Sequence, residues 1–206
     1  MENSQAPSVN SSCVEMADVS GPTGVLSDIF RFLALSLRYP AAELFDEDYF
    51  AALRSLLEGV GWHEDISELD DLIAGDSDII ETLQVEYTRL FINAAPHVIA
   101  PPYGSVYMKG EGTIMNRSTE RVRDFYRQHG FDLAAGNEIA DHITYELDFL
   151  SLLAESENRE GEEELFLGKF FRPWFGKFHN QVIEGADHHF YRVVVRLIDF
   201  FTKEEV

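Results

Sequence analysis

The stretch Leu90-Phe91-Ile92-Asn93-Ala94-Ala95-Pro96-His97-Val98-Ile99-Ala100-Pro101-Pro102-Tyr103-Gly104-Ser105-Val106-Tyr107 interrupts a chain that otherwise has helical periodicity. It holds three prolines, no Asp, Glu, Lys or Arg, and a run of aromatic and aliphatic residues. Proline lacks a backbone donor, and the residue before it avoids the α region, so the segment is predicted to be extended. A connection this long inside a compact domain is usually functional or disordered. Its apolar content favours an ordered binding or packing loop.

On both sides of this loop, apolar residues recur at the three- and four-residue spacing of amphipathic helices. The predicted helices cover residues 25–38, 46–58, 65–74, 76–91, 118–129, 137–157, 174–184 and 187–201, with a further apolar segment at 165–171. Their expected N-caps include Asp46, Asp76 or Ser77, and Ser118, and Gly130 is expected just after a helix end. No segment shows a convincing strand pattern. The predicted class is all-α, a single-domain bundle of roughly nine helices with the proline-rich loop between the fourth and the fifth.

Length and charge narrow the functional classes. The 206 residues suffice for one domain, with residues 1–23 predicted as a flexible tail and 24–206 as the helical domain. The formal net charge of −21 disfavours nucleic acids and anionic membranes and favours basic ligands. The lone cysteine, Cys13, excludes an internal disulfide, and neither a secretion signal nor a membrane span is evident. A cytoplasmic protein is expected.

The candidates for chemistry are Glu138, Asp141, His142 and Glu146. In a helix over 137–157, Glu138, His142 and Glu146 would share one face, beside the apolar stripe. Such a row is either half of a metal site or a surface row of ion pairs, and carboxylate partners would raise the pKa of the histidine. The di-iron pattern requires Glu and His three residues apart on paired helices, and no second copy occurs. No catalytic triad, phosphate loop or zinc signature is present, so we predict no enzyme, catalytic residue, cofactor or metal.

Three motifs in order then carry a family resemblance: Tyr87-Thr88-Arg89-Leu90-Phe91, Ala100-Pro101-Pro102-Tyr103-Gly104-Ser105-Val106-Tyr107, and Asn137-Glu138-Ile139-Ala140-Asp141-His142-Ile143. The chain resembles the TorD/DmsD family of cytoplasmic molybdoenzyme chaperones, also called redox enzyme maturation proteins. It departs from the family pattern where Asn93-Ala94 replaces Gly-Pro, where Glu138-Ile139 replaces Glu-Pro, and where Ile99 or Ala100 replaces the first proline of the loop.

The resemblance implies an all-helical chaperone that binds the twin-arginine signal peptide of a molybdenum-cofactor oxidoreductase, delays export and assists cofactor insertion. The implied partners are that peptide, the apo form of the catalytic subunit and, peripherally, the Tat export machinery. Carboxylates pair with guanidinium groups, and an apolar groove suits the rest of such a peptide. The residues expected to bind it are Leu90, Phe91, Pro101, Pro102, Tyr103, Ser105, Val106, Tyr107, Glu138, Asp141, His142 and Glu146.

Two other functions stay open from the sequence. One is a helical metal-binding protein that uses Glu138, His142 and Glu146, and the other is an interaction module whose loop only packs against the long helix. The absence of a phosphate-binding loop disfavours guanine nucleotides. A monomer and a dimer are both compatible with the sequence.

Overall fold

The computed structural model describes residues 22–75, 78–94, 97–108, 114–133, 139–156 and 161–204. The predicted tail therefore lies almost wholly outside the described residues. The described residues form helices α1 (Pro22–Ser36), α2 (Glu47–Val60), α3 (His63–Gly75), α4 (Ile79–Tyr87), α5 (Gly104–Tyr107), α6 (Arg117–Gln128), α7 (Ile143–Glu155), α8 (Glu162–Phe166), α9 (Arg172–Gly185) and α10 (His189–Thr202), and the π-helical turns η1 (Thr88–Ile92) and η2 (Leu167–Phe171). Within these ranges no strand occurs, and the predicted all-α class is confirmed.

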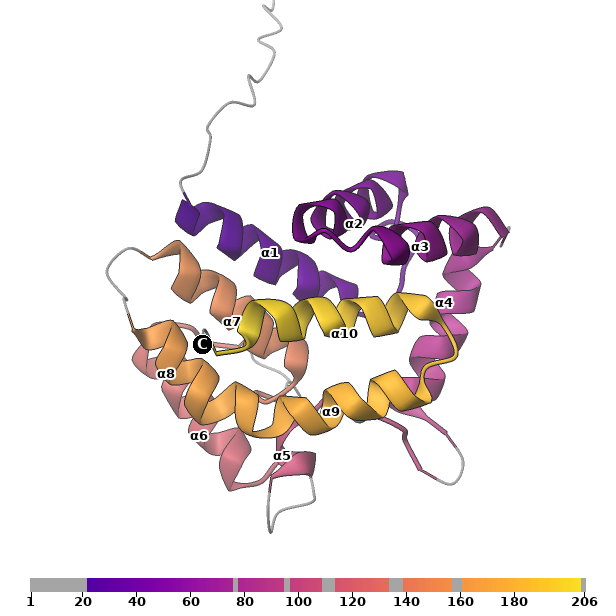
Figure 1. Ribbon diagram of the computed structural model, residues 1–206. Coiled ribbons are helices and arrows are strands. Elements are labelled where there is room, and N and C mark those ends of the chain that lie inside the picture. The colour runs from indigo at the N-terminus through magenta and orange to yellow at the C-terminus, as the bar shows by residue number, and fades with distance from the viewer. Residues whose placement is uncertain are drawn as a thin grey trace, which may run out of the picture.

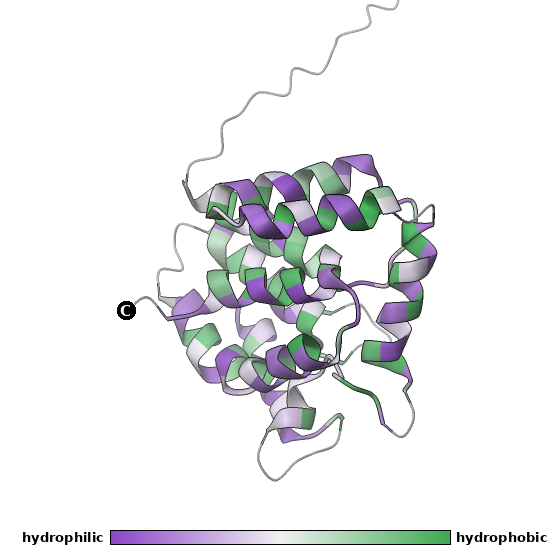
Figure 2. Ribbon diagram, turned by 45° about the vertical axis from the view of Figure 1, so that its right-hand side comes forward, coloured by the Kyte–Doolittle hydropathy of each residue, from purple (hydrophilic) through white to green (hydrophobic). Residues whose placement is uncertain are grey.

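The helices form a layered bundle with α7 and α10 inside it (Figure 1). Helix α1 packs along α7, α9 packs beside α10, and the pair α2 and α3 covers one side of α10. Most helices carry hydrophilic and hydrophobic residues on different sides, as amphipathic helices must (Figure 2). Helix α4 continues into η1, and α8 continues through η2 into α9, so the described residues contain nine continuous helices. None of these helices is long and apolar enough to span a bilayer.

The helix ends show which local rules hold. Asp46 caps α2, its carboxylate accepting from the Tyr49 amide at 2.9 Å, as predicted. Gly130 follows α6 with a φ of 75°, the left-handed conformation expected of a helix-ending glycine. Two predicted caps need correction. Asn116, not Ser118, caps α6, and Asp78 caps α4, whereas positions 76 and 77 lie outside the described residues.

The largest correction concerns the helix predicted over 137–157. It begins only at Ile143, because the backbone before it pairs with the proline segment. The Ile143 amide donates to the Pro102 carbonyl, and the Gly104 amide donates to the Asp141 carbonyl, both at 2.9 Å. These bonds form an isolated antiparallel bridge between Tyr103 and His142. Residues 134–138 lie outside the described residues.

The proline segment is also shorter than predicted. Its start is helical, because η1 extends α4 as far as Ile92, and its end forms the single turn of α5. Between them, the Ala100 amide donates to the Leu90 carbonyl at 2.8 Å. The segment thus folds back on the helix it leaves, and it delivers Tyr103 and Ser105 to the start of α7.

Candidate functional site

The site begins where the proline segment meets the start of α7. Besides the backbone bonds already described, the Ser105 amide donates to Asp141 Oδ2 at 2.6 Å. Asp141 is therefore fixed by α5, and its second oxygen, Oδ1, remains available to another group. Short polar side chains before helices commonly bind backbone amides in this way.

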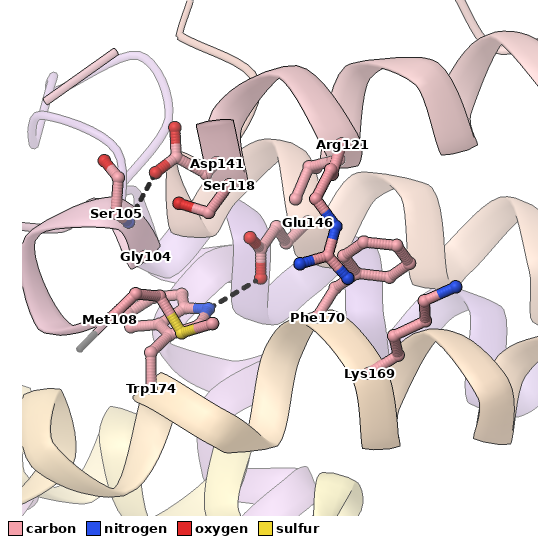
Figure 3. Close-up of a pocket in the computed structure, with 11 residues that line it drawn as sticks. Gly104, Ser105, Met108, Ser118, Arg121, Asp141, Glu146, Lys169, Phe170 and Trp174 are labelled. Atoms are coloured by element: carbon pink, nitrogen blue, oxygen red, sulfur yellow. Dashed lines mark hydrogen bonds between the residues drawn. The ribbon is translucent and has the colours of Figure 1, made fainter. Parts of the chain in front are cut away.

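Trp174 of α9 forms the opposite wall. A Cβ at Gly104 would lie 2.8 Å from Trp174 Nε1, so only glycine allows this close approach of α5 and α9. The indole Nε1–H donates to Glu146 Oε2 at 3.2 Å. Glu146 projects from α7 between these two walls, and its other oxygen, Oε1, points away from Trp174 (Figure 3).

These walls enclose a small cavity, which we call the Glu146 pocket. It is lined by Gly104, Ser105, Met108, Ser118, Arg121, Val122, Asp141, Glu146, Lys169, Phe170 and Trp174. Figure 3 shows Glu146 near its centre, with Asp141 and Ser105 on one side and Arg121 and Lys169 on the other. The interior volume is about 20 Å³, which is enough for one water molecule.

The pocket contains three buried polar atoms that have no hydrogen-bond partner among the described residues. They are Ser105 Oγ, Asp141 Oδ1 and Glu146 Oε1. The residues themselves are 0%, 1% and 0% exposed. Most buried polar atoms in folded proteins are paired, and each exception needs an explanation. Three such atoms around one cavity make it the candidate binding site of the described residues.

The electrostatics of the pocket are dominated by its two carboxyl groups. Burial, and then the negative charge of Asp141, raise the pKa of Glu146 well above its usual range, although the bond from Trp174 acts in the opposite direction. Burial and the neighbouring carboxylate therefore both favour the neutral form of Glu146. Tyr126 lies on the α6 side, donates to the Ala140 carbonyl at 3.1 Å, and has a pKa raised well above its usual range by burial.

His142 is the N-cap of α7 and not a member of a helix-surface row. Its Nδ1 lies 2.7 Å from Thr144 Oγ1 and accepts from the Thr144 amide at 3.3 Å. Its ring meets the Tyr103 ring edge-on, with centroids 5.0 Å apart. Burial lowers the pKa of His142 to about 4, and the Asp141 charge offsets this only in part. The interpretation of His142 as a cation is therefore wrong, because desolvation outweighs the neighbouring carboxylate.

The apolar residues expected to line a groove lie at different depths. Leu90, Phe91 and Tyr107 are buried in the core. Pro101, Tyr103 and Val106 are partly exposed, and Pro102 is buried. The expectation of an open groove lined by Leu90, Phe91 and Tyr107 needs correction, because η1 turns the first two side chains inward and Phe178 packs against Phe91 and Tyr107.

The metal-binding alternative finds no support in the described residues. His142 Nδ1 is engaged with Thr144, whereas Glu146 faces Trp174 and the pocket. The described ranges contain no group of three histidine, cysteine, aspartate or glutamate side chains arranged to hold a metal. Glu138, the third proposed ligand, lies outside the described residues.

Several pocket residues were missed by the sequence reasoning. Trp174, Arg121 and Lys169 come from segments far from the proline loop in the chain, and no local pattern connects them. The Arg121 guanidinium carbon and Lys169 Nζ lie 6.0 Å and 5.3 Å from the centroid of the Phe170 ring, so two cations lie beside Phe170 in the pocket lining. The only sequence feature that pointed toward any of these residues was the excess of arginine in helix α6, which includes Arg121.

The fold and the site define an all-α protein with a small pocket, which contains two buried carboxyl groups, between a proline turn and a central helix. A family model described as "Nitrate reductase delta subunit" matches residues 55–180. Among similar proteins, the Tat proofreading chaperone DmsD of Salmonella typhimurium (strain LT2) is 32% identical over 119 residues, 57% of each chain. The chaperone protein TorD of Vibrio atlanticus (strain LGP32) is 27% identical over 179 residues, covering 78% of this chain and 83% of TorD.

A solved structure agrees with these sequence relatives. The crystal structure of a proposed redox enzyme maturation protein from Archaeoglobus fulgidus matches with a TM-score of 0.60 and 29% identity, covering 93% of this chain and 100% of that one. The chain belongs to the nitrate reductase delta subunit family, and the predicted TorD/DmsD membership is confirmed. The matched region spans 57% of the length of the DmsD relatives.

Proposed function

We propose that this protein is a cytoplasmic chaperone, without catalytic turnover, for a molybdenum-cofactor oxidoreductase. It binds the twin-arginine signal peptide of that enzyme, delays its export and assists cofactor insertion into the apo catalytic subunit. The names of the relatives support this proposal, since they describe Tat proofreading and redox enzyme maturation. Contact with the Tat machinery would follow from holding the signal peptide.

The observation that carries the proposal is the set of unpaired polar atoms in the Glu146 pocket. A guanidinium group has five N–H donors in a planar fork and no acceptor. The pocket presents the complementary array, with Asp141 Oδ1, Glu146 Oε1 and Ser105 Oγ buried around one cavity. The formal charge of −21 would also accelerate encounter with a basic peptide.

The remaining part of the peptide would lie on the surface beside the pocket. Pro101, Tyr103 and Val106 are partly exposed there, and the Tyr103–His142 ring pair borders them. The buried residues Leu90, Phe91, Pro102 and Tyr107 would support this surface from below. Glu138 belongs to the proposed site by its place in the sequence motif alone.

The direct test is a binding measurement with three synthetic peptides that differ only at the arginine pair. The twin-arginine peptide is expected to bind at least about tenfold more tightly than its Lys-Lys version, since a lost hydrogen bond to a charged group costs roughly 1.5–3 kcal/mol. The Ala-Ala version should bind more weakly still. Equal affinity for all three would refute recognition of guanidinium groups.

A second prediction concerns Asp141. Asp141→Asn keeps an oxygen that can accept from the Ser105 amide, so the fold should persist, but it removes the charge facing the pocket. Peptide affinity is expected to fall by roughly 1–3 kcal/mol, the cost typical of a buried hot spot. Asp199→Asn, the same change at an exposed position of α10, should leave affinity as it was. Isothermal titration calorimetry compares the two, and equal affinities would place the site elsewhere.

A further inference from the structure

Glu146 combines two properties that rarely coexist without a function. It is fully buried, and one of its carboxyl oxygens has no partner among the described residues although it faces a cavity. Its neighbour Asp141 lines the same cavity, and its Oδ1 also has no partner among the described residues. Two carboxyl groups so close cannot both ionise easily in a buried site. A cation that entered between them would change this balance.

We propose that the Glu146 pocket takes up one guanidinium group in exchange for the proton of Glu146, so that peptide binding releases a proton. This inference rests on the proposed function, because the guanidinium group is assigned to the signal peptide. No covalent bond forms to the ligand. The O–H bond of the Glu146 carboxyl group breaks, its proton passes to the solvent buffer, and the carboxylate that remains pairs with the guanidinium.

The charges explain why the proton must leave. In the free protein, burial and the charge of Asp141 raise the pKa of Glu146 well above its usual range and so favour its neutral form. A protonated Oε1 would present a donor to the donors of the incoming guanidinium, whereas an ionised Oε1 accepts from them. An opposite charge within about 4–6 Å also favours ionisation. Entry of one positive charge and departure of one proton leave the net charge of the pocket unchanged.

The other groups around Glu146 do not supply this proton. Tyr126 of α6 has a pKa raised well above its usual range, and Trp174 of α9 donates through a nitrogen that does not titrate. Ser105 of α5 is a neutral hydroxyl. Arg121 of α6 and Lys169 of η2 line the pocket as cations beside Phe170, and neither forms an ion pair with Glu146 among the described residues. Glu146 is the acid of this pocket whose pKa burial raises, so it is assigned as the source of the proton.

The size of the cavity limits the stoichiometry. A volume of about 20 Å³ holds one water molecule, so even one guanidinium requires the long side chains of the pocket lining to move aside. Met108, Arg121 and Lys169 are unbranched chains that can do so. Only one arginine of a pair enters, and the second stays outside.

The experiment is calorimetric titration of the twin-arginine peptide into the full chain at pH 7, in phosphate and in Tris. Because the two buffers differ in ionisation enthalpy, the difference in observed heat counts the protons. We expect release of about one proton by the wild type and none by Glu146→Gln. The wild-type affinity should also rise with pH, about tenfold per pH unit while Glu146 is neutral in the free protein. Peptide binding without proton release, or equal release by both proteins, overturns the inference.

A second measurement separates this inference from the proposed function. If the peptide does not bind, the proposed function fails, and N-methylguanidinium is then used as the probe. In a Trp62→Phe background, fluorescence reports Trp174, whose N–H donates to Glu146. We expect a pH transition that Glu146→Gln abolishes and that the probe moves to lower pH. A transition that saturating probe leaves in place overturns the proton exchange.

Discussion

Glu86→Ala is expected to lower the free energy of unfolding by about 3 kcal/mol, because it leaves several partly buried donors without an acceptor. Glu86, near the end of α4, is buried and accepts from Arg89 Nε at 2.8 Å and from Arg89 Nη2 at 2.9 Å. It also accepts from the backbone amides of Asp187, at 2.6 Å, and His188, at 3.3 Å. Urea denaturation at neutral pH measures the loss.

This network joins α4 and η1 to the turn between α9 and α10. Arg89 donates to the Gly185 carbonyl at 2.7 Å, so the end of α9 is held against η1. Burial alone would raise the pKa of Glu86, but the bonds from Arg89 and from the two amides outweigh it and lower that pKa. The carboxylate therefore remains charged and acts as a fixed acceptor at the turn between α9 and α10. Arg89 is partly exposed, so the expected cost is at the low end for a broken buried pair.

The matched control is Glu81→Ala, on the same helix but with an exposed side chain. It is expected to change the free energy of unfolding by less than about 0.5 kcal/mol, as surface substitutions usually do. A loss below about 1 kcal/mol for Glu86→Ala would mean that water replaces the carboxylate at the turn. The network would then be dispensable for stability.

The parts of the fold that could be predicted from the sequence depend on local rules. Apolar spacing gave the helices, and Asp46 and Gly130 lie at helix ends as their chemistry requires. Even the β-branched run 193–195 is helical and buried within α10, as the spacing of its neighbours predicts. Ser118 failed as a cap because Asn116, two residues earlier, has the same capacity. The sequence alone does not show which of two neighbouring residues with this capacity will be the N-cap.

The candidate site was predicted only in part, because contacts between distant segments determine it. Helix α7 begins at Ile143 and not at the predicted residue 137. The backbone groups of Asp141 and Ile143 form hydrogen bonds with Gly104 and Pro102 instead of continuing the helix. Glu146 was expected beside the core stripe, yet it is fully buried, because Trp174 of α9 covers it. The spacing of apolar residues within one helix does not show which residues of another helix will cover it. The pairing of Asp141 with Glu146 around one cavity became visible only in three dimensions.

We expect the free energy of unfolding to fall in acid, and we expect His142 to contribute a large part of this loss. In the unfolded chain a histidine binds its proton near pH 6.5, whereas in the folded protein burial lowers the pKa of His142 to about 4. Between these values the unfolded state holds more protons, so stability falls as the pH falls. A difference of about 2.5 pH units corresponds to roughly 3 kcal/mol, fully lost only below pH 4.

His142→Asn isolates this contribution. Asparagine is among the best N-cap residues and can accept from the Thr144 amide, so α7 should retain its start. The variant loses the ring contact with Tyr103, a cost that does not depend on pH. The informative quantity is therefore the difference in unfolding free energy between variant and wild type, followed from pH 7 to pH 4. Over this range the wild type is expected to lose roughly 3 kcal/mol more unfolding free energy than the variant.

The sign of the effect distinguishes His142 from the buried acid beside it. Glu146 has a raised pKa, so it favours the folded state as the pH falls, and it is ionised in the unfolded chain above about pH 4.5. Protonation of carboxylates that do not interact with His142 affects wild type and variant alike and cancels in the comparison. Protonation of Asp141 does not cancel, because its charge acts on His142. His63→Asn, at an exposed position of α3, controls for loss of an imidazole. If the wild type and His142→Asn lost stability in parallel, His142 would have to accept its proton inside the folded protein, and the Tyr103–His142 junction would be open to water.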